Sequence, residues 1–275
     1  MTRCELCFHR CALEEGQRGI CRARVCRGGR ILCENYGCIT SLALDPIEKK
    51  PLRHFFPGSW ILSAGSYGCN LRCPFCQNDS ISMSDGGGLA VQRAAPEILA
   101  DQAAELVSRG NIGLAYTYNE PLVGYEFVRD CAGLVRERGL KNVLVTNGTL
   151  LQEPLKKLLP LIDAMNVDLK GFSEGYYRWL GGDLETVKAF IKTSVEAGCH
   201  VEVTTLAVPG ENDGGEEMDA EARWLASLNP EIPLHVSRFF PRYRVLDKPP
   251  TSVETVYALA ETARRHLKHV YEGNC

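Results

Sequence analysis

The chain has 275 residues, of which 45% are hydrophobic and 24% charged, and its formal net charge is −3. A chain of this size can bury one sizeable core, or a barrel with a small extra module. The charge balance argues against nucleic acid as a partner, and no apolar run is long enough to cross a bilayer. The thirteen cysteines follow a start without the features of an export signal. We therefore expect a cytoplasmic protein with reduced thiols and metal ligands rather than disulfides.

The first 40 residues are rich in cysteine. Four of the thiols have the spacing C-x2-C-x3-C-x9-C: Cys4, Cys7, Cys11 and Cys21. This segment has too little apolar material to fold alone, so we predict that the four thiols hold a metal. Zinc and a second iron–sulfur cluster both remain open, since four thiolates serve either. Free thiols are the alternative, and His9 is a further candidate ligand.

A hairpin is expected next, with its turn at Gly28-Gly29. Three more cysteines lie in or beside it and are either cluster ligands or buried residues: Cys26, Cys33 and Cys38. Residues 45–58 then form a proline-punctuated connector with little periodicity.

Residues 60–66 predict a short buried strand, and three thiols at the spacing C-x3-C-x2-C follow it directly: Cys69, Cys73 and Cys76. Thiolates are the soft ligands that iron–sulfur clusters need. Three thiolates leave one iron of a [4Fe–4S] cluster free to bind a substrate or cofactor. A structural zinc site is the alternative, but zinc normally takes four ligands and no fourth is local.

Helices and strands alternate through the rest of the chain. Helices are expected over 94–109, 121–138, 150–159, 183–197, 216–228 and 253–267, and strands over 112–116, 142–145, 162–168, 200–208 and 234–240. With the strand at 60–66, this pattern predicts an α/β fold with six parallel strands. A partial (β/α)6 barrel fits better than a doubly wound sheet, because no dinucleotide-binding glycine pattern follows the first strand. We expect a cysteine-rich module and connector over 1–58 and the barrel over 59–275.

Polar residues stand at the ends of successive predicted strands. They are Asn119, Glu120, Thr146, Asn147, Asp168 and Lys170, with His235 inside the last strand. In α/β barrels the chemistry gathers at the C-terminal ends of the strands, so we expect these side chains to form one site. A carboxylate beside a cation suits a zwitterionic ligand. We expect no residue before Trp60 to be needed for this site.

Several of these motifs resemble one enzyme superfamily. The stretch Cys69-Asn-Leu-Arg-Cys73-Pro-Phe-Cys76 resembles the signature of the radical S-adenosylmethionine (radical SAM) enzymes, including the aromatic residue Phe75 before the last cysteine. Asn119-Glu-Pro looks like a variant of their Gly-Gly-Glu motif. Thr146-Asn-Gly and Asp168-Leu-Lys170 resemble segments of pyruvate formate-lyase activating enzyme that contact SAM. Such activases carry an aspartate where this chain has Val145, so the resemblance does not extend to their cation site.

A second resemblance runs over nearly the whole chain, to the AmmeMemoRadiSam-system radical SAM enzymes. It rests on residues 4–11, 19–21, 45–51, 116–121 and 235–241. The resemblance implies reductive cleavage of SAM at a [4Fe–4S] cluster, giving a 5′-deoxyadenosyl radical that takes hydrogen from a substrate. It also implies cofactor contacts from Phe75, Asn119, Glu120, Thr146, Asn147, Asp168, Lys170 and His235.

Partners remain open at this stage. The resemblance implies an external one-electron donor of the flavodoxin or ferredoxin type. The substrate is either a glycine backbone in a partner enzyme or another molecule. An iron–sulfur electron-transfer or metal-binding protein without SAM chemistry is the rival interpretation, and the polar strand ends argue against it because an electron carrier needs no zwitterion site.

Overall fold

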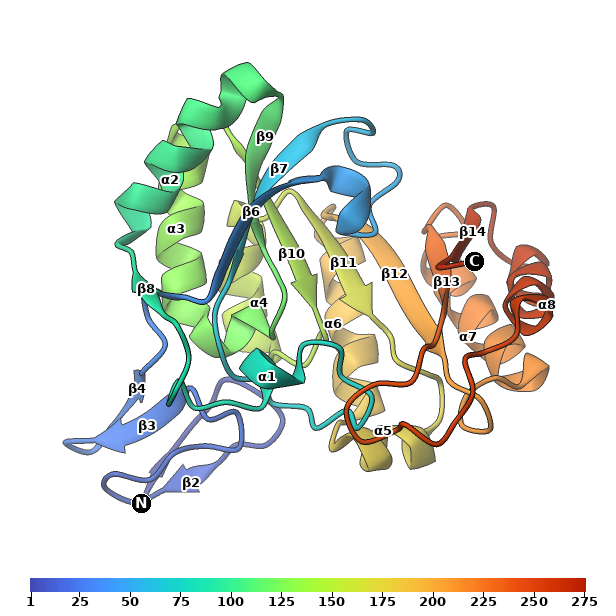
Figure 1. Cartoon of the computed structure of the whole chain (residues 1–275), viewed down its shortest axis with the longest axis horizontal. Helices are drawn as coiled ribbons and strands as arrows, with labels where there is room; N and C mark the ends of the chain where they lie inside the picture. Colours follow the sequence, from blue (N-terminus) through green and yellow to red (C-terminus); the bar gives the residue numbers. More distant parts are fainter.

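An eight-stranded sheet forms the frame of the molecule in the computed structural model, which describes residues 1–275 (Figure 1). Its strands are β6 (Ser41–Pro46), β7 (Trp60–Gly65), β9 (Asn111–Tyr116), β10 (Lys141–Thr146), β11 (Ala164–Asp168), β12 (His200–Ala207), β13 (Leu234–Arg238) and β14 (Val270–Gly273). From one edge to the other they follow chain order, β6-β7-β9-β10-β11-β12-β13-β14. All neighbours are parallel except the antiparallel pair β6–β7.

This order distinguishes a partial barrel from a doubly wound sheet, in which the order reverses at a switch point. Successive right-handed crossovers in one direction keep the helices on one side of the sheet. These helices are α2 (Pro96–Glu105), α3 (Tyr125–Glu137), α4 (Gln152–Leu158), α6 (Leu184–Glu196), α7 (Gly215–Leu228) and α8 (Val253–Arg264). The six predicted parallel strands and the predicted partial barrel are therefore confirmed.

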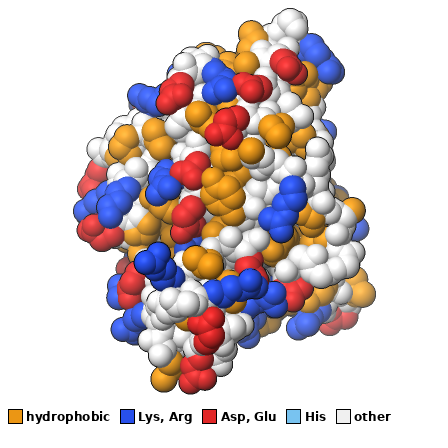
Figure 2. All heavy atoms as spheres, turned by 90° about the vertical axis from the view of Figure 1, so that its left-hand side faces the viewer, with side chains coloured by type: hydrophobic (Ala, Val, Ile, Leu, Met, Phe, Trp, Pro, Cys, Tyr) orange, Lys and Arg blue, Asp and Glu red, His pale blue; other side chains and the backbone are white.

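Shorter elements complete the fold. The short helices are α1 (Asp79–Ser82) and α5 (Glu174–Leu180), and the 3-10 turns are η1 (Ile47–Lys49), η2 (Leu106–Arg109), η3 (Pro121–Gly124) and η4 (Leu159–Leu161). None of the helices combines the length and apolar character that a membrane span requires. On the face shown in Figure 2, acidic and basic side chains are interspersed, in keeping with the small net charge.

The N-terminal segment folds as a set of two-stranded sheets beside α2 and α3. They pair β1 (Thr2–Arg3) with β2 (Ala12–Leu13), β3 (Arg24–Arg27) with β4 (Arg30–Cys33), and β5 (Cys38–Ile39) with β8 (Gln92–Arg93). The predicted hairpin is confirmed: Gly28 and Gly29 have φ of 57° and 70° and connect β3 to β4. The buried Arg24 pairs with Glu126 of α3 at 2.7 Å, which fixes this segment against the barrel.

Two strands of the eight-stranded sheet were missed from the sequence. β6 lies partly within the predicted connector, and β14 follows α8. Because β6 pairs with β7 across the predicted boundary, it belongs to the same sheet as the barrel strands. The division into residues 1–58 and 59–275 remains a prediction.

Candidate active site

The loop that carries the three thiols leaves the end of β7 in a fixed conformation. A Cβ at Gly65 would lie 2.8 Å from the Tyr118 ring, so glycine is required where β7 ends. Tyr118 itself has φ of 73°, an uncommon backbone conformation for a bulky residue and one that often marks functional sites. Further along, the Arg72 N–H donates to the Leu180 carbonyl and the Arg244 N–H to the Pro74 carbonyl, each at 2.8 Å. These contacts join the loop to α5 and to the segment after β13.

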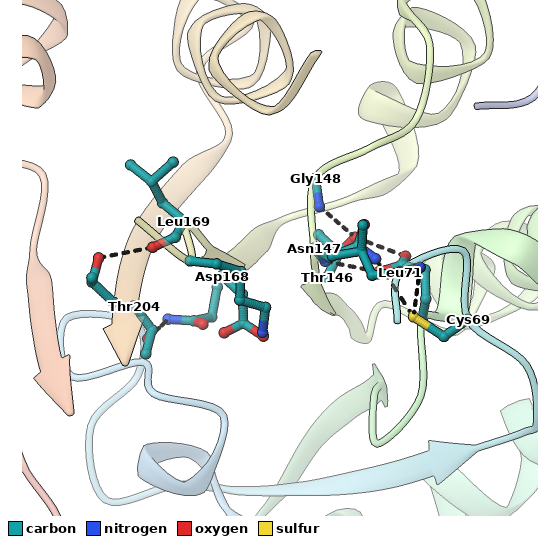
Figure 3. Close-up of polar contacts among 12 residues, drawn as sticks. Cys69, Leu71, Thr146, Asn147, Gly148, Asp168, Leu169 and Thr204 are labelled. Carbon is teal, nitrogen blue, oxygen red and sulfur yellow. Dashed lines mark hydrogen bonds and ion pairs between the residues drawn. The ribbon is translucent and has the colours of Figure 1, made fainter. Parts of the chain in front are cut away.

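The loop faces a cavity of about 750 Å³ at the C-terminal ends of the parallel strands. The eleven barrel residues predicted for the site all line it: Cys69, Cys73, Phe75, Cys76, Asn119, Glu120, Thr146, Asn147, Asp168, Lys170 and His235. Figure 3 shows the Cys69 thiol beside Asn147, with Asp168 on another wall of the same space. Residues up to 166 positions apart in the sequence (69 to 235) therefore meet in one place, because parallel strands end at a common edge.

The thiols are suited to holding a cluster. Cys69 Sγ accepts weak hydrogen bonds from the Leu71 N–H at 3.4 Å and from Asn147 Nδ2 at 3.7 Å. Burial raises the pKa of the Cys69 thiol well above its usual value and that of Cys73 to about 11. A bound metal reverses this effect, since a coordinating thiol loses its proton. Three thiols from one loop, with two donors aimed at the Cys69 sulfur, fit a three-thiolate [4Fe–4S] cluster.

Glu120 organises the ends of β9 and β10. Its carboxylate accepts hydrogen bonds from the Leu122 N–H at 3.0 Å, the Thr146 hydroxyl at 2.8 Å and the Asn147 N–H at 2.7 Å. Burial raises its pKa to about 7, against the opposite effect of these donors. The Glu120 carboxylate therefore fixes the backbone that turns into the cavity after β10.

Asn119 and Asn147 hold the cluster loop, the segment 66–76 that carries the three thiols. Asn119 Oδ1 accepts from the Ser66 N–H at 3.0 Å, and its Nδ2 donates to the Gly68 carbonyl at 2.9 Å. Asn147 Nδ2 donates to Asn70 Oδ1 at 2.9 Å. Both side-chain amides are thus engaged in positioning the loop.

A charged pair lies at the end of β11. Lys170 Nζ contacts Asp168 Oδ2 at 2.6 Å. Burial lowers the pKa of Lys170, but Asp168 and the nearby thiols raise it more, so that it lies above its usual value. The pair offers the carboxylate and ammonium that a zwitterion would need.

The His235 side chain is oriented by a buried glutamate on the neighbouring strand. Its Nε2 lies 2.7 Å from Glu202 Oε2, and Glu202 is fully buried. The same carboxylate accepts from the N–H groups of Arg53 and His54 at 3.0 and 2.7 Å, and these donors, with His200 and His235, lower its pKa to about 2 against the effect of burial. The sequence did not identify Glu202 as a site residue. A glutamate two residues after His200 in a predicted buried strand is unusual, and it could have marked this position.

Residues before Trp60 also line the cavity, namely Glu48, Lys49, Lys50, Pro51 and Arg53, and the expectation that none of them is needed for the site stays a prediction. Lys50 is buried and pairs with Asp45 at 2.9 Å, and the Tyr118 hydroxyl donates to the same carboxylate at 2.7 Å. In the sequence, the Asp-Pro-Ile-Glu-Lys-Lys-Pro motif at 45–51 was the feature that could have indicated this contribution to the cavity.

The N-terminal thiols lie elsewhere. Cys4, Cys7, Cys11 and Cys21 line a second, smaller cavity of about 20 Å³, together with His9. His9 Nε2 lies 2.8 Å from the carbonyl oxygen of Asn70 in the cluster loop. Nowhere in the chain do three or more His, Cys, Asp or Glu side chains already surround the position of a single ion.

Comparisons with known proteins identify the family of this chain. The family described as the Radical SAM superfamily matches residues 64–225. Protein MJ0808 of Methanocaldococcus jannaschii is 41% identical over 99% of this chain and 81% of its own length. Pyruvate formate-lyase-activating enzyme of Clostridium pasteurianum is 28% identical over 55% of this chain and 63% of its own.

Among solved structures, Streptococcus suis SuiB bound to S-adenosylmethionine shares the fold with a TM-score of 0.59, at 14% identity over 76% of this chain and 48% of SuiB. The radical SAM family uses a [4Fe–4S] cluster and SAM, the cofactors that the thiol loop and polar strand ends indicate. The chain belongs to the radical SAM superfamily.

Proposed function

We propose that this chain binds a [4Fe–4S] cluster through Cys69, Cys73 and Cys76 and cleaves SAM reductively to abstract hydrogen from a substrate. The observation that carries the proposal is the single cavity shared by the three thiols and the polar strand ends. When bound, the cluster and SAM would supply the electron transfer and the 5′-deoxyadenosyl radical. The chain's own residues bind, orient and exclude water.

Each part of the cavity wall has a proposed role. Asp168 and Lys170 bind the charged ends of SAM, and Glu120 presents the Thr146–Asn147 backbone to it. Asn119 positions the cluster loop from behind. Phe75 stacks near Tyr176, with ring centroids 6.5 Å apart, and keeps water from the last cysteine of the loop.

The substrate proposal is a glycine backbone in a partner enzyme, which would make this chain a glycyl-radical-enzyme activase. The similarity to pyruvate formate-lyase-activating enzyme supports it. An external donor of the flavodoxin or ferredoxin type would deliver the electron. All thirteen cysteines are free thiols, which supports work in a reducing compartment such as the cytoplasm.

Anaerobic reconstitution tests the reaction. Iron, sulfide and electron paramagnetic resonance spectra are measured with and without SAM, and 5′-deoxyadenosine is quantified after reduction with dithionite. Cys73→Ala should abolish the product, whereas Cys275→Ala, at an exposed thiol, should not. Product formation by Cys73→Ala at the wild-type rate would refute the proposal.

We also propose an auxiliary metal at Cys4, Cys7, Cys11 and Cys21. Their cavity of about 20 Å³ has room for one water-sized body, so a zinc ion needs less rearrangement than a cluster. Metal analysis of the triple variant Cys69→Ala/Cys73→Ala/Cys76→Ala tests this. Zinc without sulfide is expected, and iron with sulfide would mean a cluster. If neither metal is above background while the first 40 residues still resist protease, the proposed metal site is refuted.

A further inference from the structure

Three arginines line the cavity, from β13, from the segment that follows it and from the connector. Arg238 is on β13, Arg242 follows it, and both line the cavity. Arg53 joins them from the connector, with its guanidinium 4.9 Å from the ring centroid of Tyr271 in β14. We name these three residues the arginine end.

No carboxylate in the structure forms an ion pair with the arginine end. Arg238 Nε donates to the Thr251 carbonyl at 2.6 Å, and its guanidinium lies over the Phe240 ring at 4.9 Å. The remaining N–H groups of the three side chains have no acidic partner.

The acidic side chains of the same cavity are engaged with other groups. Asp168 pairs with Lys170, and Glu272 pairs with Arg264 at 2.7 Å. Glu48 accepts a hydrogen bond from the Gly58 N–H at 2.7 Å. Of the cavity's lysines, Lys50 is neutralised by Asp45. Lys49 shares the same Asp45 carboxylate at 3.4 Å, so the cavity's cations that have no carboxylate partner are those of the arginine end.

This charge is separate from the part of the cavity assigned to SAM. Asp168 and Lys170 follow β11, and β13 is two strands further along the sheet. At about 4.8 Å per strand, the separation is roughly 10 Å. The proposed partners of the charged ends of SAM follow β11, so the arginine end can bind a different anionic group.

We propose that the substrate carries a carboxylate or phosphate that the arginine end binds, an inference that rests on the proposed function. The planar guanidinium fork matches either anion through two parallel hydrogen bonds. His235, oriented by Glu202, lies on the same strand as Arg238 and lines the same cavity. A neutral glycine loop would leave these three charges unused, so a glycine substrate must bring an acidic group with it.

Anion binding to the reconstituted protein tests the inference. Inorganic phosphate and succinate are titrated calorimetrically into wild type, Arg238→Met, Arg242→Met and the control Arg109→Met, all with saturating SAM. Arg109 lies at the end of η2 and does not line the cavity. We expect millimolar binding of at least one anion, weakened roughly fivefold or more in both cavity variants and unchanged in the control.

Tighter binding of phosphate would indicate a phosphate ester as the substrate, and tighter binding of succinate a carboxylate. Absence of binding to wild type, or equal binding by all four proteins, would overturn the inference. Arg242 is exposed, so its variant keeps the test valid if Arg238→Met fails to fold. Failure of the proposed function would show separately, as wild-type protein that holds its cluster but yields no 5′-deoxyadenosine.

Discussion

Replacing Glu120 by glutamine removes acceptor capacity at the junction of β9 and β10. Three donors converge on the carboxylate: the Leu122 N–H and the Thr146 hydroxyl on Oε1, and the Asn147 N–H on Oε2. A glutamine amide has one oxygen, so its nitrogen must face at least one of these donors. The least disruptive orientation places the nitrogen against the Asn147 N–H.

The size of the effect follows from burial. Glu120 is 4% exposed, so the displaced N–H cannot turn to water. A buried donor left without a partner costs about 1–3 kcal/mol. Because about 1.4 kcal/mol corresponds to a factor of ten in affinity, Glu120→Gln should weaken SAM binding roughly fivefold to a hundredfold.

Anaerobic calorimetry with SAM measures the affinity, and urea unfolding measures the stability. Glu137→Gln, at an exposed position near the end of α3, is the matched control. SAM affinity within twofold of wild type for Glu120→Gln, with unchanged stability, would show that Glu120 does not organise the SAM-facing backbone.

Three further predictions concern buried charges. Burial raises the pKa of Glu221 to about 8 from 4.5, so its stability contribution is complete below pH 4.5 and is lost as pH rises toward 8. Glu221→Gln should therefore gain stability over wild type by about 1.4 kcal/mol per pH unit between about pH 5 and 7 in urea unfolding, and a pH-independent difference would contradict this. Lys170→Met leaves Asp168 without its partner and should weaken SAM binding by roughly tenfold in calorimetry, whereas Lys157→Met on α4 should not. Arg24→Met leaves the Glu126 carboxylate unpaired and should cost roughly 3 kcal/mol, with faster proteolysis of residues 1–40. Equal cleavage rates would show that this pair does not fix the module, and Glu126→Leu in the same protein should recover part of the loss.

The Glu221 carboxyl shares a hydroxyl donor with a backbone carbonyl. The Thr205 hydroxyl has one hydrogen, and it contacts both the Leu169 carbonyl at 2.9 Å and the Glu221 carboxyl. The hydroxyl donates to both oxygens. Glutamine keeps a side-chain oxygen that can accept from Thr205, which is why Glu221→Gln suits the test.

The parallel strands and their polar ends were predictable because both depend on local pattern. Short apolar runs between segments of helical spacing predict the strands. Because parallel strands place their C-terminal ends at one edge of the sheet, Glu120 and Asp168 could be expected to share a site. β14 was missed because its four residues are too few to show an alternating pattern. β6 was missed because it contains Pro46 and alternates poorly between buried and exposed residues.

The remaining site contacts depend on long-range packing. The Tyr118 hydroxyl meets Asp45 across 73 residues of sequence, and Glu202 collects donors from the connector about 148 residues earlier. No local pattern encodes such pairings, since they arise when the connector crosses the base of the barrel. The only indication of these contacts in the sequence was a charged residue inside a predicted strand or connector. Taken alone, each such residue is as easily explained as an exposed surface residue.

The unclosed sheet has a consequence for how molecules reach the cavity. β6 and β14 stand at opposite edges and share no backbone ladder. Side chains alone span the seam near its base, where His54 Nε2 lies 2.6 Å from the Tyr271 hydroxyl and Arg53 covers the same ring. Parting these side chains breaks no strand pairing, so the seam can widen without unfolding the sheet. A polypeptide can therefore lie across the barrel with both of its ends in solvent, whereas a closed barrel would require a free end or a tight loop.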